Sequence, residues 1–131
     1  MTMETPLHRV EGLGSAHSGV KHFWRQRVTA AALVPLSIWF GWAVLGLVGA
    51  RAPAVLFFLT QSPLGIPLNA ILMGAFILIM VYHMALGLQV VIDDYVHGKW
   101  GKLSLMLLTR AACFAVAVVS LFALFRIVGS V

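Results

Sequence analysis

The chain has 131 residues, of which 61% are apolar and 10% are charged, and its mean hydropathy is +0.98. Soluble globular domains carry about 25% charged residues, so the composition argues against a soluble enzyme, and it excludes intrinsic disorder. The single cysteine, Cys113, excludes a disulfide framework and a cysteine-based metal cage. The net charge of +5 comes from basic residues at the ends of apolar segments, which favours membrane flanks over a nucleic-acid surface. We therefore predict an integral membrane protein.

The first 27 residues are polar, lack apolar periodicity and end in a basic segment at residues 21–27. They predict a flexible cytoplasmic N-terminal arm. A secretory signal would place an apolar core directly after a basic start. Here the first long apolar run begins only at Val28, so no cleavable signal is evident.

Three apolar runs are long enough to cross a bilayer, which takes about 20 residues. They predict transmembrane helices at about residues 28–50, 68–92 and 103–128. Together these form an all-α membrane anchor over residues 28–128. The uncharged stretch from Ala52 to Ile92 is too long for one helix and is divided by Pro53, Pro63, Gly65 and Pro67, so we expect a re-entrant or interfacial connector at 51–67.

The distribution of basic residues predicts the orientation, because cytoplasmic loops are enriched in Lys and Arg. The arm and the loop at 93–102 lie on one side, whereas Arg51 and Arg126 lie on the other. The N-terminus is therefore predicted to face the cytoplasm or matrix, on the side that carries Arg9, Lys21, Arg25, Arg27, Lys99 and Lys102.

His83 is the one titratable side chain near the middle of a predicted helix, where polar groups are costly and are functional candidates. Asp94 follows eleven residues later, roughly 16 Å along a helix, on the same face, with Gly87 between them. A neutral imidazole in an apolar pocket is a common axial ligand of haem iron, and a glycine beside it lets a flat group approach. A histidine bonded to a polar group on a neighbouring helix is the alternative, and the spacing leaves both open.

The chain does not supply a second histidine at the depth of His83, because the other histidines fall outside the predicted spans. If two histidines bind a haem, the second must come from another chain. The predicted helices would then be part of a heteromeric bundle. The histidines outside the spans are His8, His17, His22 and His97.

Asp94 and Tyr95 lie where the second predicted helix meets water on the basic side. A phenol beside a carboxylate suits a quinone, which takes a hydrogen bond on its carbonyl and protons on reduction. Interfacial anchoring is the simpler alternative, since tyrosine is enriched at membrane surfaces. Arg27, at the start of the first helix, could pair with a carboxylate such as a haem propionate.

Residues 82–97 (YHMALGLQVVIDDYVH) resemble the H-x3-G-x6-D-Y signature of the small cytochrome b membrane anchor of succinate dehydrogenase, Complex II. Residues 22–30 (HFWRQRVTA) are similar to the start of that family's first helix. The resemblance covers about residues 15–128.

The resemblance implies that His83 is an axial ligand of haem b, shared with the larger cytochrome b anchor of the complex. It implies that Tyr95 donates a hydrogen bond to ubiquinone, that Asp94 lies in the proton path, and that Gly87 and Arg27 border the haem or quinone site. It also implies docking of the iron–sulfur and flavoprotein subunits on the cytoplasmic face. The chain would sit among the lipids of a bacterial inner membrane and would not be catalytic alone.

Three alternatives remain open on the sequence. An anchor of a fumarate reductase-type complex would share the same chemistry and differ in its quinone and soluble partners. A purely structural membrane subunit would carry no haem. A small transporter is disfavoured, because one histidine makes a poor transport path.

Overall fold

The computed structural model describes residues 18–61 and 66–130 and contains, in that part of the chain, four α-helices and no strand. Three of them, α2 (Ser18–Leu47), α4 (Leu68–Tyr95) and α5 (Lys99–Val128), are long and apolar enough to cross a membrane. The short helix α3 (Ala52–Thr60) lies between α2 and α4 in the chain. The predicted all-α fold with three membrane-spanning helices is confirmed.

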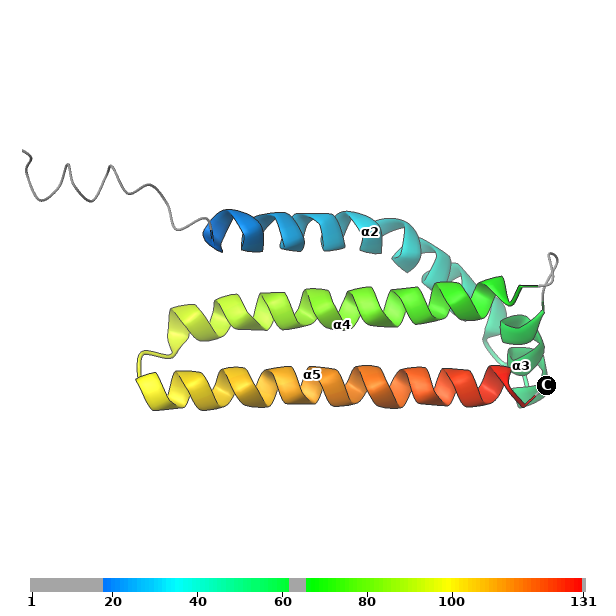
Figure 1. The fold of residues 1–131 in the computed structure, drawn as a ribbon. Helices are drawn as coiled ribbons and strands as arrows, with labels where there is room; N and C mark the ends of the chain where they lie inside the picture. Colours follow the sequence, from blue (N-terminus) through cyan, green and yellow to red (C-terminus); the bar gives the residue numbers. More distant parts are fainter. Residues whose placement is uncertain (1–17, 62–65, 131) are drawn as a thin grey trace, which may run out of the picture.

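The central helix is α4, which packs against both α2 and α5, while α3 covers its first turns and contacts α5 (Figure 1). The start of α2 and the loop between α4 and α5 lie at one end, and α3 and the end of α5 lie at the other (Figure 1). Among the described residues the buried core is small and wholly apolar, which leaves most large apolar side chains for lipid or partner subunits. Its members are Ala43, Leu59, Ala70, Phe76, Leu86, Ile92 and Cys113.

Helix α2 begins at Ser18, so the segment from Ser18 to Arg27, expected as the end of a flexible arm, is helical. Hydropathy marks only the part of a helix that lies in lipid, whereas Lys, Arg and Gln are good helix formers that extend it into water. Residues 1–17, including Arg9, lie outside the described part of the chain. Pro35 lies inside α2 and removes one helical hydrogen bond, and the helix bends in its second half (Figure 1). Gly49, at φ 76°, follows its end.

The expected connector is largely helical. Helix α3 starts with Pro53 in its first turn, where a missing N–H costs nothing. The side-chain amide of Asn69 donates a hydrogen bond to the Phe58 carbonyl at 2.8 Å, which ties α3 to the start of α4. Residues 62–65, with Pro63 and Gly65, lie outside the described part of the chain.

Helices α4 and α5 include the predicted segments and extend beyond them toward the loop that joins them. The rings of Phe40 and Phe76 stack at 4.6 Å between α2 and α4. On the other side of α4, a Cβ at Gly74 would lie 3.5 Å from the Leu124 side chain, so a glycine lets α5 approach closely. The basic groups at the start of α2 thus share one end of the bundle with Lys99 and Lys102 (Figure 1).

Candidate functional site

His83 lies in the middle of α4 and faces α2. Its Nδ1 lies 2.8 Å from the hydroxyl oxygen of Thr29, and the contact is partly buried. Its other ring nitrogen, Nε2, forms no hydrogen bond with a described residue. His83 can therefore be both bonded to a neighbouring helix and a metal ligand. The hydrogen bond to Thr29 uses one ring nitrogen and leaves the other for a ligand.

The Thr29 hydroxyl also contacts its own helix. Its oxygen lies 2.7 Å from the carbonyl of Arg25 and 3.1 Å from that of Gln26. Threonine hydroxyls in helices commonly donate to the carbonyl one turn earlier. Thr29 lies within residues 22–30, the segment that resembles the family's first helix, but nothing in the sequence assigned it a role.

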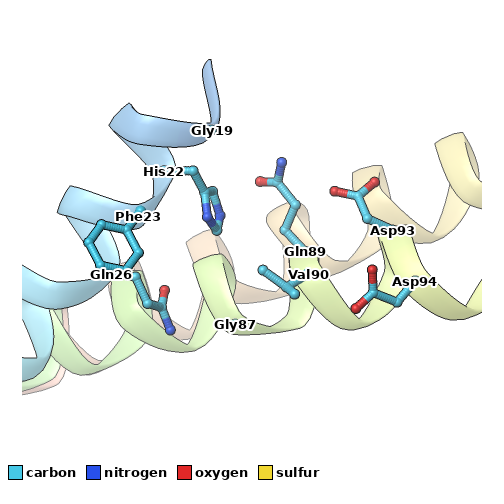
Figure 2. Close-up of a pocket in the computed structure, with 9 residues that line it drawn as sticks. All are labelled: Gly19, His22, Phe23, Gln26, Gly87, Gln89, Val90, Asp93 and Asp94. Atoms are coloured by element: carbon cyan, nitrogen blue, oxygen red, sulfur yellow. The ribbon is translucent and has the colours of Figure 1, made fainter. Parts of the chain in front are cut away.

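A groove of about 740 Å³ lies between the first turns of α2 and the last turns of α4. Figure 2 shows His22 and Gln26 pointing from α2 toward α4. His22 Nε2 and Gln26 Oε1 are buried and have no hydrogen-bond partner among the described residues. The groove is lined by Gly19, His22, Phe23, Gln26, Gly87, Gln89, Val90, Asp93 and Asp94.

The sequence places His22 outside the predicted membrane spans and does not predict a role for Gln26. Both are polar groups in the first turns of α2, which the sequence assigns to the arm. The signal that could have revealed them is helical spacing, because residues four apart lie on the same face of a helix. Orphaned buried polar atoms at the mouth of a groove favour a bound polar ligand there.

Gly87 lies in the groove, one turn along α4 from His83. A Cβ at this position would lie 3.7 Å from Nε2 of Gln26, an ordinary contact distance. The absence of a side chain on Gly87 therefore keeps the groove open between α2 and α4.

The structure separates Asp94 from Tyr95. Asp94 lines the groove, whereas Tyr95 is 79% exposed and does not line it. Asp93, the other carboxylate at this end, forms a salt bridge with Lys102 at 2.6 Å. Tyr95 therefore needs a partner surface if its phenol is to act in a closed site.

Arg27 is exposed, and its guanidinium carbon lies 5.1 Å from the centroid of the Phe23 ring, a cation–π distance. It forms no salt bridge with any other described residue. Within residues 18–61 and 66–130, no three His, Cys, Asp or Glu side chains gather as a metal site.

The comparisons with known proteins agree with one another. A family model described as succinate dehydrogenase/fumarate reductase transmembrane subunit matches residues 1–124. The succinate dehydrogenase hydrophobic membrane anchor subunit of Paracoccus denitrificans is 32% identical over 102 residues, 78% of this chain and 75% of that protein. The corresponding protein of Rickettsia bellii is 33% identical over 88 residues, 67% and 66% of the two chains. The succinate dehydrogenase membrane anchor subunit of Reclinomonas americana is 31% identical over 94 residues, 71% and 76% of the two chains. No solved structure matches at a significant level.

Proposed function

The chain belongs to the succinate dehydrogenase/fumarate reductase transmembrane subunit family, and from this membership we propose that it is the small anchor of a succinate:ubiquinone oxidoreductase that shares a haem b and helps to form the quinone site. The family model covers two enzymes, but the three relatives described above are all named for succinate dehydrogenase, which favours succinate oxidation. Two of these relatives are from bacteria, which favours a bacterial cytoplasmic membrane.

The observation that carries the haem proposal is the environment of His83. It lies in the middle of a helix long enough to span the membrane, and its Nδ1 is bonded to Thr29 while Nε2 makes no such bond with a described residue. An imidazole held through one nitrogen can ligate iron with the other. The donor available at His83 therefore fits haem iron, and the larger cytochrome b anchor would supply a second ligand.

Two further groups would hold the haem. Gly87 presents no side chain one turn from His83 and so allows a flat macrocycle to approach α4. Arg27 would pair with a propionate, since its guanidinium has no carboxylate partner among the described residues. Bound there, haem b would supply a one-electron carrier.

The quinone proposal rests on the end of the bundle where α2 starts and α4 ends. Tyr95 would donate a hydrogen bond from its phenol to a quinone carbonyl, and Asp94 would pass protons toward it from the groove. Because Tyr95 is 79% exposed in the isolated chain, the site would be completed by the partner subunits. The iron–sulfur and flavoprotein subunits would dock at this basic end, and the N-terminus would face the cytoplasm.

The test is the optical spectrum of the detergent-purified complex, reduced with dithionite minus oxidised. We expect a b-type α band that is lost or altered in a His83→Ala variant. The matched control is His97→Ala, because His97 is an exposed histidine beyond the end of α4 and should leave the band unchanged. A band of equal intensity and position in His83→Ala would remove His83 as the ligand.

A further inference from the structure

The contact between Thr29 and His83 joins two helices at the depth of the proposed haem ligand. Thr29 lies on α2 and His83 on α4, 54 positions apart in the chain, and 2.8 Å separates Oγ1 from Nδ1. Among the described residues it is the one side-chain hydrogen bond between these two helices. Because the contact is part-buried, this bond is stronger than its equivalent in water.

The positions of the hydrogens follow from counting donors. A carbonyl oxygen only accepts, so the contacts of Thr29 Oγ1 with the carbonyls of Arg25 at 2.7 Å and Gln26 at 3.1 Å are satisfied when the hydroxyl directs its single proton to them. The hydroxyl oxygen then has lone pairs but no proton for His83. The bond at 2.8 Å is satisfied when Nδ1–H of the imidazole donates to Thr29. Nε2 is consequently the nitrogen that carries a lone pair.

We propose that Thr29 is a positioning residue for His83, which fixes the imidazole in its Nδ1-protonated form and orients its ring so that Nε2 binds the iron. The inference rests on the proposed haem ligation by His83 and extends it. A second hydrogen bond to a ligating imidazole sets its tautomer, its ring orientation and its basicity. Here that partner is anchored in turn to the Arg25 carbonyl, so the ligand geometry depends on the rotation of α2 against α4.

The test replaces Thr29 in the assembled complex. Thr29→Val keeps the shape of the side chain but removes the hydroxyl, and Thr29→Ser keeps the hydroxyl. The matched control is Thr60→Val, because the Thr60 hydroxyl also donates one turn back, to the Leu56 carbonyl at 2.8 Å, and contacts no described histidine. If the Thr29→Val complex does not assemble, Thr29→Ala takes its place. It also removes the hydroxyl, and alanine favours the helix more than valine does.

Three quantities are measured on each purified variant: haem retained per complex, the haem midpoint potential by redox titration, and the g-values of the low-spin haem by electron paramagnetic resonance. Loss of such a partner typically weakens metal binding about 10- to 100-fold, and we expect a loss in this range in Thr29→Val. We also expect shifted g-values and a shifted midpoint potential, with Thr29→Ser and Thr60→Val close to the parent complex.

The outcomes separate this inference from the one on which it rests. If His83→Ala loses the haem band while Thr29→Val and Thr29→Ala keep the parent g-values and potential, Thr29 has no positioning role. If His83→Ala keeps the haem band, His83 is not the ligand, and the proposed haem ligation is wrong whatever Thr29 does. A shift in Thr29→Val that Thr29→Ser does not reverse would indicate altered packing and would also overturn the proposal.

Discussion

Lys102 Nζ lies 2.6 Å from Asp93 Oδ1, and this salt bridge joins the first turn of α5 to the last turns of α4. The neighbouring carboxylate, Asp94, forms no salt bridge with a described residue, although both aspartates line the groove beside α2. The two adjacent aspartates thus differ in their ion pairing. One has a structural partner, and the other is available to a ligand.

The first prediction compares these two carboxylates. Asp94→Asn should slow quinone reduction by about 100-fold, the lower end of the usual contribution of a positioned acid or base. Asp93→Asn should cost less than about 1 kcal/mol of stability and leave the rate near that of the parent, because its salt bridge is partly exposed to solvent. The measurement is succinate–quinone reductase activity, with thermal unfolding in parallel. Equal loss of rate in both variants would contradict the assignment.

The second prediction concerns Tyr95. Tyr95→Phe removes a phenol that would donate to the quinone, and one such hydrogen bond is worth about 1 kcal/mol. We expect the KM for quinone to rise about 3- to 10-fold, while succinate oxidation by artificial acceptors is unchanged. Tyr82→Phe, in the middle of α4, is the control. The assignment is wrong if both electron acceptors lose activity to the same extent.

The third prediction tests the space at Gly87. A Cβ there would lie 3.7 Å from Gln26 Nε2, so Gly87→Ala should assemble and keep its haem. Gly87→Leu would extend into the groove, and we expect a complex with reduced haem content or a raised KM for quinone. Both are measured on purified complex, normalised to the flavin of the soluble partner. A Leu variant with the parent haem content and KM would show that the groove holds neither ligand.

Much of the fold was predictable from hydropathy. The start of α4 at Leu68 was expected because Pro67 precedes a long apolar run, and the structure begins the helix there. The ends of the helices were less predictable, since the backbone remains helical where the side chains become polar. Tyr95 and Lys99 thus lie inside α4 and α5, although each is outside the predicted apolar segment.

The site was predictable only in part. His83 is conspicuous as a titratable group within an apolar run, and Gly87 and Asp94 follow it at helical spacing on the same face. The contact with Thr29 was not predictable, because it depends on which face α2 turns toward α4. A helix that is apolar on every side carries no pattern that fixes its rotation. His22 and Gln26 were missed for another reason, because they lie in the polar first turns of α2, which the sequence assigns to the arm.

The three long helices cross in alternating directions, with α3 remaining at the end opposite the start of α2 (Figure 1). Three crossings by helices of this length would place Lys21 and Arg126 in different aqueous compartments. A membrane-impermeant reagent added to one side would then reach only one of them. The two ends of the bundle, each built from both halves of the sequence, would meet different solutes, proteases and lipids.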